Sequence, residues 1–360
     1  MDTARLTRRG NNRPPPQHEG PQRSSSRSLS PPPSPGRLKR KDKTDGTALS
    51  MTTLVMRFCV GSVLLAWVAL ACNILMPQAF SFNEALGEAE VSFSVKSLSP
   101  AAASATARQV VTRPTVEIVA EYAHDPKAFT QGLLVVKDGA SKFLIESTGL
   151  YGESSLRKVD IETGLVLAKY DLPSELFGEG VTLSEDNQLV MLTWKSRKGY
   201  VFDLDISHPK GAFVEVAREF EFDTVTGEGW GIDYDGVHLL VSDGSSTIMF
   251  WDPKTMQEVR RIDVNYRGQL VSHLNELEYA NGYLYANIWY QYVIAKIDPT
   301  DGTIVTVFDC SQLAQQAGAV SNRDAVLNGI AYDGNEDVFY LTGKLWSRVF
   351  KVKLLEPPSP

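Results

Sequence analysis

A glutamate with a glycine on each side is the residue of this sequence best suited to acid–base chemistry. It is Glu179, in the segment FGEG. The two glycines allow another backbone or a ligand to approach closely. A carboxyl group that faces aromatic walls has a raised pKa and can carry a proton in both directions near neutral pH. Glu179 is therefore the leading candidate for a catalytic acid and base.

Polar residues recur along the chain at a nearly constant distance from this glutamate. Their type differs from one repeat to the next, which purely structural repetition would not produce, although such groups often only bond neighbouring strands or buried water. Large aromatic residues adjoin them, and aromatics around a few acids and amides are typical of a small-ligand pocket. The polar residues, separated by 48, 49, 47 and 53 positions, are Gln131, Glu179, Glu228, Asn275 and Asn328. The aromatic residues are Phe129, Phe177, Trp194, Trp230, Trp289 and Trp346.

Several other chemistries lack their usual patterns. The five histidines are scattered without metal-ligand spacing, and there is no nucleophile elbow, P-loop or GxGxxG segment. Cys310 is the single cysteine after residue 72, so this part of the chain cannot form an internal disulfide. We expect no metal among the catalytic groups.

The elements that position the polar residues form a five-fold repeat. Each repeat begins with alternating apolar residues, in segments 129–135, 177–183, 227–236, 274–282 and 327–334. Second and third strands follow each of them, and a fourth can be placed in all repeats except the last. The unpartnered segment 116–124 would supply the missing outer strand and close the ring. This pattern predicts an all-β, five-bladed β-propeller of four-stranded blades, with its first strands lining the axis. One short helix is expected within 311–324.

Four further segments flank the predicted propeller. Residues 1–57 are rich in Pro, Ser and Arg and read as a disordered tail. Residues 58–76 form an uncharged apolar run of 19 residues, long enough for one transmembrane helix. Residues 77–113 read as an Ala/Ser-rich stalk, 114–355 as the propeller and 356–360 as a short tail. A cleaved signal peptide is the competing interpretation of 58–76, but its apolar stretch is usually shorter.

Charge divides the chain into two unlike parts. Residues 1–57 carry 12 basic and four acidic residues, a net of +8, whereas the rest carries 24 and 39, a net of −15. Basic residues before the apolar run predict a cytosolic N-terminus and a type II orientation, with the propeller in the Golgi or endoplasmic reticulum lumen or outside the cell. The acidic balance argues against nucleic-acid binding.

The repeats also carry motifs of a known family. The segments FTQGL, LIESTGLYGESSLRKVD, LFGEGVTL, EGWGID, LNELEYANGYLYANIW, LNGIAYD and LTGKLW occur in that order over roughly residues 115–354. In these the chain resembles the plant and bacterial type of glutaminyl-peptide cyclotransferase, also called glutaminyl cyclase. The resemblance implies a five-bladed propeller that converts N-terminal glutaminyl residues of peptides to pyroglutamyl and releases ammonia.

The same resemblance implies roles for individual residues. Glu179 would move protons between the α-amine and the leaving nitrogen, and the reaction would need no cofactor, although a structural divalent ion on the axis is possible. Gln131, Asn275 and Lys344 would bond the substrate, and Lys344 or Asn275 would stabilise the oxyanion. The aromatic walls implied are Phe129, Phe177, Trp194, Trp230 and Trp289.

Alternatives remain for the residues and for the whole chain. Lys344 could merely pair with an inner-strand acid, Trp346 could belong to the core, and Glu276 and Glu278 are expected to bond within the blade. A metal-dependent hydrolase or lactonase would need an axial metal, for which Asn275, Glu276, Asn328 and Asp243 could serve. A non-catalytic binding propeller is the third possibility. We expect a monomer that acts on peptides with N-terminal glutamine.

Overall fold

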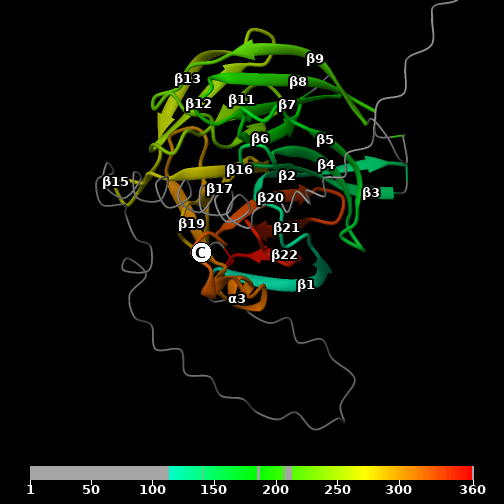
Figure 1. The fold of residues 1–360 in the computed structure, drawn as a ribbon. Coiled ribbons are helices and arrows are strands. Elements are labelled where there is room, and N and C mark those ends of the chain that lie inside the picture. Colours follow the sequence, from blue (N-terminus) through cyan, green and yellow to red (C-terminus); the bar gives the residue numbers. More distant parts are fainter. Residues whose placement is uncertain (1–112, 140, 185–186, 206, 208–212, 359–360) are drawn as a thin grey trace, which may run out of the picture. The chain divides into compact units, whose positions relative to one another are not determined.

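The computed structural model describes residues 113–139, 141–184, 187–205, 207 and 213–358 (Figure 1). Its described part is built of five four-stranded antiparallel sheets. The all-β, five-bladed propeller predicted from the repeats is therefore confirmed. The predicted tail of 1–57, the apolar run of 58–76 and nearly all of the stalk lie outside the described residues. Within the described ranges, no helix is both long and apolar enough to span a bilayer.

Each blade runs from an inner strand to an outer edge. Blade 1 contains β2 (Thr130–Asp138), β3 (Ser141–Thr148), β4 (Ser155–Asp160) and β5 (Val166–Asp171). Blade 2 contains β6 (Gly178–Leu183), β7 (Gln188–Thr193), β8 (Lys198–Leu204) and β9 (Val214–Glu221). Blade 3 contains β10 (Ile232–Tyr234), β11 (Leu239–Val241), β12 (Thr247–Asp252) and β13 (Gln257–Asp263). Blade 4 contains β16 (Leu274–Ala280), β17 (Tyr283–Ile288), β18 (Val293–Ile297) and β19 (Ile304–Asp309).

Blade 5 joins the two ends of the propeller. Its order is β20 (Leu327–Asp333), β21 (Val338–Gly343), β22 (Arg348–Leu355) and β1 (Thr115–Ala123). The first described strand is thus the outer strand of the last blade, and β1 and β22 lie together in Figure 1. The two strands pair antiparallel from Thr115 opposite Leu355 to Ala123 opposite Arg348. This is the closing strand that the unpartnered segment 116–124 predicted.

The core consists of five apolar clusters, each between two neighbouring blades. Successive side chains of a strand point to opposite faces, so one inner strand can serve two clusters. Leu133 packs against Ala331 and other residues of blade 5, whereas Leu134 packs with Val181 of blade 2. Inner strands β2, β6, β10, β16 and β20 each contact the next, and β20 contacts β2. The ring is therefore closed around its axis by packing as well as by the β1–β22 pair.

Two connections between blades carry structure of their own. A small hairpin, β14 (Asn265–Tyr266) and β15 (Gln269–Leu270), precedes blade 4. Helix α3 (Ser311–Gln316) and the 3₁₀ turn η1 (Ala319–Ser321) precede blade 5, where the sequence predicted one short helix. Leu313 and Ala314 of α3 are buried in the cluster between blades 4 and 5. These connections lie before inner strands, on the same face of the ring as the start of β6.

The third repeat needs one correction. We expected Glu228 to occupy the position of Glu179 in blade 3, but β10 begins only at Ile232. The residue before the equivalent glycine is Trp230, whose carbonyl oxygen accepts a 2.7 Å hydrogen bond from the Gly180 nitrogen. The prediction for Glu228 was wrong by two residues, because GEGWG offers two places where a large residue lies between glycines.

Candidate active site

Side chains of three blades form a hydrogen-bonded chain that ends at Glu179. Gln131 on β2 donates through Nε2 to Oε1 of Glu179 on β6, at 3.2 Å. Asn328 on β20 donates through Nδ2 to Oε1 of Gln131 at 3.3 Å and to the Thr130 carbonyl at 2.9 Å. Asn328 therefore orients the Gln131 amide so that its NH₂ group faces Glu179. Gln131 was expected to bond the substrate, and Asn328 was not expected in the site, although it is one of the repeated polar residues.

The backbone around Glu179 is held by both neighbouring blades. A Cβ atom on Gly180 would lie 2.6 Å from the Trp230 carbonyl oxygen, so this position accepts only glycine without a shift of the backbone. From blade 1, Ser147 donates to the Glu179 carbonyl at 2.6 Å. Blade 3 repeats the arrangement, because Ser242 donates to the Asn275 carbonyl at 2.6 Å. The same hydrogen bond thus anchors two of the predicted catalytic residues.

Glu179 and Lys344 have shifted pKa values because both are buried. Burial raises the pKa of Glu179 well above its ordinary value; the Lys344 charge opposes this rise and the Glu228 charge adds to it. Burial lowers the pKa of Lys344 to about 8, against the opposing charges of Glu179 and Asp324. Burial thus shifts the pKa of Glu179 upward and the pKa of Lys344 downward, as is common for groups at functional sites.

The Lys344 ammonium is buried close to the Phe129 ring and to the Glu179 charge. Its Nζ atom lies 4.8 Å from the centre of the Phe129 ring. In the described part of the chain, no ion pair within 4 Å joins it to a carboxylate. A direct pair with an inner-strand acid, the alternative considered for this residue, is thus not formed.

Two buried amide oxygens lack a protein partner. They are Oδ1 of Asn275 and Oδ1 of Asn328, on the inner strands of blades 4 and 5. A buried acceptor without a hydrogen bond costs about 1–3 kcal/mol, so such atoms are usually satisfied by water or by a ligand. Asn275 therefore offers an acceptor for an N–H group.

The predicted aromatic residues form two groups of contacting rings. Phe177 lies 6.2 Å from Phe129 and 5.4 Å from Trp194, between ring centres. Trp230 and Trp289 form the second group, with edge-to-face rings 5.2 Å apart. All five of these side chains thus belong to contacting clusters, and Trp230 and Glu179 are additionally linked through the Gly180 backbone. Phe129, Phe177 and Trp230 come just before the inner strands of blades 1, 2 and 3, whereas Trp194 and Trp289 follow the second strands of blades 2 and 4.

Tyr151 is an aromatic residue of the first group that was not predicted from the sequence. Tyr151 is 46% exposed and its ring centre lies 5.4 Å from Phe177 and 6.5 Å from Trp194. It sits in the turn between β3 and β4, after Leu150 with a φ of 88°. Burial raises its pKa, and the charges of Glu179 and Glu228 raise it further. Its place within LIESTGLYGESSLRKVD, one of the family motifs, was the available signal.

Three of the residues considered from the sequence, Trp346, Glu276 and Glu278, bond to the backbone of the propeller. Trp346 is fully buried in the core, and its Nε1 donates to the Ala325 carbonyl at 3.0 Å, so the core alternative is confirmed. Glu276 occupies the position of glycine in the other inner strands and accepts from the Leu133 and Ile330 nitrogens at 3.2 and 2.8 Å. Glu278 accepts from the Tyr332 nitrogen at 2.9 Å. We expected bonds within the blade, but both glutamates bond to other blades.

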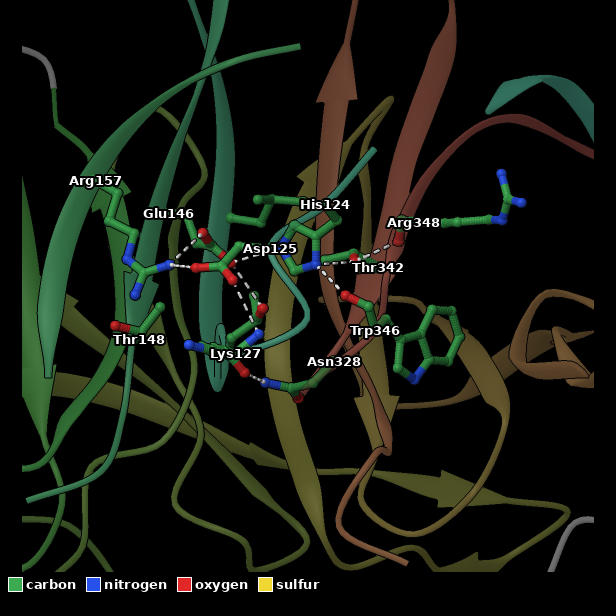
Figure 2. Close-up of polar contacts among 12 residues, drawn as sticks. His124, Asp125, Lys127, Glu146, Thr148, Arg157, Asn328, Thr342, Trp346 and Arg348 are labelled. Carbon is green, nitrogen blue, oxygen red and sulfur yellow. Dashed lines mark hydrogen bonds and ion pairs between the residues drawn. The ribbon is translucent and has the colours of Figure 1, made fainter. Parts of the chain in front are cut away.

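A buried ionic network lies where the ring closes (Figure 2). His124 follows the closing strand β1, and its ring nitrogens face the Trp346 carbonyl at 2.7 Å and Oε1 of Glu146 at 2.9 Å. Glu146 also accepts from Thr130 at 2.7 Å. Thr130 precedes Gln131, and Trp346 closes the turn that carries Lys344. The network therefore holds the backbone next to Gln131 and Lys344, two of the predicted site residues.

Two of the four residues considered for an axial metal, Glu276 and Asp243, have their carboxylates engaged by other groups. Glu276 is used by backbone N–H groups, and Asp243 accepts from the Thr226 nitrogen at 2.7 Å and the Ser245 hydroxyl at 2.5 Å. In the described ranges, no three His, Cys, Asp or Glu side chains are grouped as a metal site would need.

Comparisons with known proteins agree with this architecture. A family model described as glutamine cyclotransferase matches residues 91–354. The chain is 40% identical over 240 residues to a glutaminyl-peptide cyclotransferase of Arabidopsis thaliana, covering 66% of this chain and 71% of the relative. The crystal structure of Myxococcus xanthus glutaminyl cyclase superposes with a TM-score of 0.59 at 35% identity, covering 67% of this chain and 97% of that one. The chain therefore belongs to the glutamine cyclotransferase family.

Proposed function

We propose that this protein is a glutaminyl-peptide cyclotransferase, an acyltransferase that converts N-terminal glutaminyl residues of peptides to pyroglutamyl. The observation that carries the proposal is the buried Glu179 carboxyl, which contacts the Gln131 amide at 3.2 Å in a site that also holds Lys344. Membership of the family supports the reaction.

The proposed reaction needs one group that moves a proton in two directions. The substrate α-amine attacks the carbon of its own γ-amide, and Glu179 takes the proton that the amine loses. Glu179 then gives this proton to the γ-nitrogen, the carbon–nitrogen bond breaks, and ammonia leaves. A carboxyl whose pKa is raised by burial suits both steps.

The other site residues have assigned parts in this scheme. The Lys344 ammonium stabilises the negative charge that develops on the γ-oxygen. The free Oδ1 of Asn275 accepts an N–H bond from the substrate. Because the reaction is intramolecular, much of the rate enhancement comes from holding the side chain folded back on the amine. Phe129, Phe177, Trp194, Trp230 and Trp289 supply the walls that hold it.

The test is a direct assay of the full chain in detergent. A peptide that begins with Gln is incubated with the protein, and free ammonia and the mass of the peptide are followed. We expect a mass loss of one ammonia, and no reaction with the same peptide acetylated at its amine. No turnover would reject the proposed function, and turnover that disappears on chelation and returns with a divalent ion would instead indicate a metal requirement that we do not propose.

The proposal extends to where the enzyme works. The uncharged run 58–76, preceded by basic residues, supports a single-pass type II membrane protein whose 114–355 domain faces a secretory lumen or the cell exterior. The expected partners are peptide substrates and the bilayer, not nucleic acid, and the expected state is a monomer. Protection of the propeller from added protease in sealed microsomes tests this topology, since a cytosolic propeller would be digested.

A further inference from the structure

Glu228 lies between the two groups of aromatic rings in the candidate site. The first group contains Tyr151, Phe177 and Trp194 with Phe129, and the second contains Trp230 with Trp289. Among the described residues, no ring contact joins the first group to the second. The separation of the two groups therefore has to be set by something other than ring packing.

The Glu228 carboxylate bridges the two groups through a single oxygen. Its Oε2 atom accepts from Nε1 of Trp194 at 2.7 Å and from Nε1 of Trp230 at 2.9 Å. An indole has only one N–H donor, so this carboxylate takes the whole hydrogen-bonding capacity of both tryptophans. Bonds of this kind to an ionised acceptor are shorter and stronger than neutral ones.

The carboxylate itself is held from two sides. Its Oε1 atom lies 3.4 Å from Nζ of Lys195, and the same ammonium lies 4.0 Å from the centre of the Trp194 ring. The Glu228 carbonyl accepts from the Thr224 hydroxyl at 2.7 Å, which ties the backbone of the loop. The Glu228 side chain is 23% exposed, so it lies at the mouth of the site and not in the core.

We propose that Glu228 is a positioning residue, which sets the distance between Trp194 and Trp230 and thereby the placement of the two rings against the substrate side chain. The contact of these rings with a glutaminyl side chain rests on the proposed function, whereas the bridge rests only on the contacts above. A plain surface ion pair with Lys195 is the competing explanation. Exposed ion pairs contribute little to stability. If Glu228 did no more than pair with Lys195, its substitution would leave the positions of the two tryptophans unchanged.

Glu228 also acts on the catalytic carboxyl through its charge. Its negative charge is one of the causes that raise the pKa of Glu179, after burial. Removing that charge therefore lowers the pKa of Glu179. The two effects of Glu228 can therefore be separated. A glutamine at this position keeps an accepting oxygen and so retains the positioning effect, but it carries no charge and so loses the effect on the pKa of Glu179.

The test compares Glu228→Ala and Glu228→Gln with Glu219→Gln as a matched control. Glu219 is an exposed glutamate on β9 that pairs with Lys198 at 3.8 Å, away from the tryptophans. In Glu228→Ala we expect the KM for a Gln-initiated peptide to rise about tenfold or more, with a smaller change in kcat. Tryptophan emission should shift to longer wavelength and become easier to quench with acrylamide. Glu228→Gln should keep KM within about threefold of wild type, because the amide oxygen still accepts from the indoles. The acidic limb of kcat/KM should move to lower pH, because the charge that raises the pKa of Glu179 is lost. Glu219→Gln should leave all readouts unchanged.

Trp194→Phe keeps the test decisive if Glu228→Ala does not fold. It removes the indole N–H and retains an aromatic ring, so KM should rise. Trp230→Phe breaks the other half of the same bridge, and the double variant Trp194→Phe/Trp230→Phe should raise KM by less than the product of the single effects. Wild-type KM and emission in folded Glu228→Ala, or fully multiplicative effects in the double variant, would overturn the proposal. If wild-type protein releases no ammonia, the function fails, and emission and quenching still decide whether Glu228 positions the tryptophans.

Discussion

Gln131 and Glu179 touch across the boundary between blades 1 and 2, with the amide Nε2 3.2 Å from the carboxyl Oε1. The amide cannot rotate freely, because Asn328 of blade 5 donates to its oxygen at 3.3 Å. The proposed proton carrier is thus oriented by residues that are far apart in sequence. Substitution of Gln131, Glu179 or Asn328 should therefore change the position of the Glu179 carboxyl or its ability to transfer a proton.

Substitutions in the hydrogen-bonded series Asn328–Gln131–Glu179 should lower kcat by unequal amounts. Glu179→Gln should reduce kcat by about 10²–10⁴-fold, because an amide cannot exchange the proton. Gln131→Ala and Asn328→Ala should each reduce kcat less, and the double variant should be no worse than Gln131→Ala alone, since Asn328 acts through Gln131. Steady-state ammonia release measures all four proteins. Independent, multiplicative effects of Gln131 and Asn328 would contradict the arrangement.

The pH dependence of kcat/KM should have limbs set by Glu179 and Lys344. The pKa of Glu179 is raised by burial, so activity should decline on acidification at a higher pH than an ordinary carboxyl would cause. The pKa of Lys344 is lowered to about 8, also by burial, so its charge and the activity should decline above that pH. Arginine keeps its charge at alkaline pH but has a different shape. Lys344→Arg should therefore be slower and should lose the alkaline decline; an unchanged alkaline limb in that variant would assign the limb to another group.

Glu276→Gln should affect stability and spare the chemistry. Each oxygen of the Glu276 carboxyl accepts one backbone N–H, from Leu133 and from Ile330. A glutamine can satisfy only one of them and turns its own NH₂ toward the other. We expect a loss of about 1–3 kcal/mol in the free energy of unfolding, measured with urea, and wild-type kcat at 25 °C in the folded protein. A large loss of kcat at unchanged stability would give Glu276 a catalytic role.

The His124–Glu146 pair should stabilise the ring most strongly in the pH range in which Glu146 is ionised and His124 is protonated. Burial alone would raise the pKa of Glu146, but the charge and hydrogen bond of His124 and the charge of Arg157 outweigh it, so the pKa is lowered. This contribution is complete above the unfolded pKa of Glu146 and is lost as pH falls through the folded value. Burial alone would lower the pKa of His124, but Glu146 outweighs it, so the pKa is raised. That contribution is complete below the unfolded pKa and is lost as pH rises through the folded value.

Glu146→Gln tests this pair. It leaves a buried imidazolium without its counter-charge and should cost about 3–5 kcal/mol near pH 6, measured by urea unfolding. Glu121→Gln is the matched control, because Glu121 pairs with Arg348 at 3.0 Å on the exposed side of the same closing strands. Its loss should stay below about 1 kcal/mol. Equal effects of the two substitutions would show that burial of the His124 pair adds nothing.

Much of the fold could be predicted because the five-fold repeat of strands appears as a repeated pattern of residues in the sequence. Alternating apolar residues and turn residues mark most strands, and counting four strands per repeat leaves one vacancy, which 116–124 fills as β1. The position of Glu179 follows from the same count, since glycines flank it where neighbouring backbones come within contact.

The contacts between blades could not be predicted in the same way. Asn328 reaches Gln131 only because the ring closes, so no local pattern reports their hydrogen bond. Trp346 and Trp289 both follow a second strand, yet one is packed inside and the other is in the site wall, because side-chain direction depends on the turn. Blade 3 was misaligned for a related reason, since its inner strand β10 has three residues and gives little alternation to align.

The pairing of β1 with β22 sets the order in which the protein can be completed during translation. The strand made first among the described ones waits for the strand made last, and until then each presents unpaired backbone groups at an open edge. When the strands of blades 1 to 4 have been made, blade 5 has only β1 and still lacks β20, β21 and β22. A premature stop within 348–355 would therefore not trim the protein but leave it without a closed ring, and such a product is a substrate for cellular quality control and not a shorter enzyme.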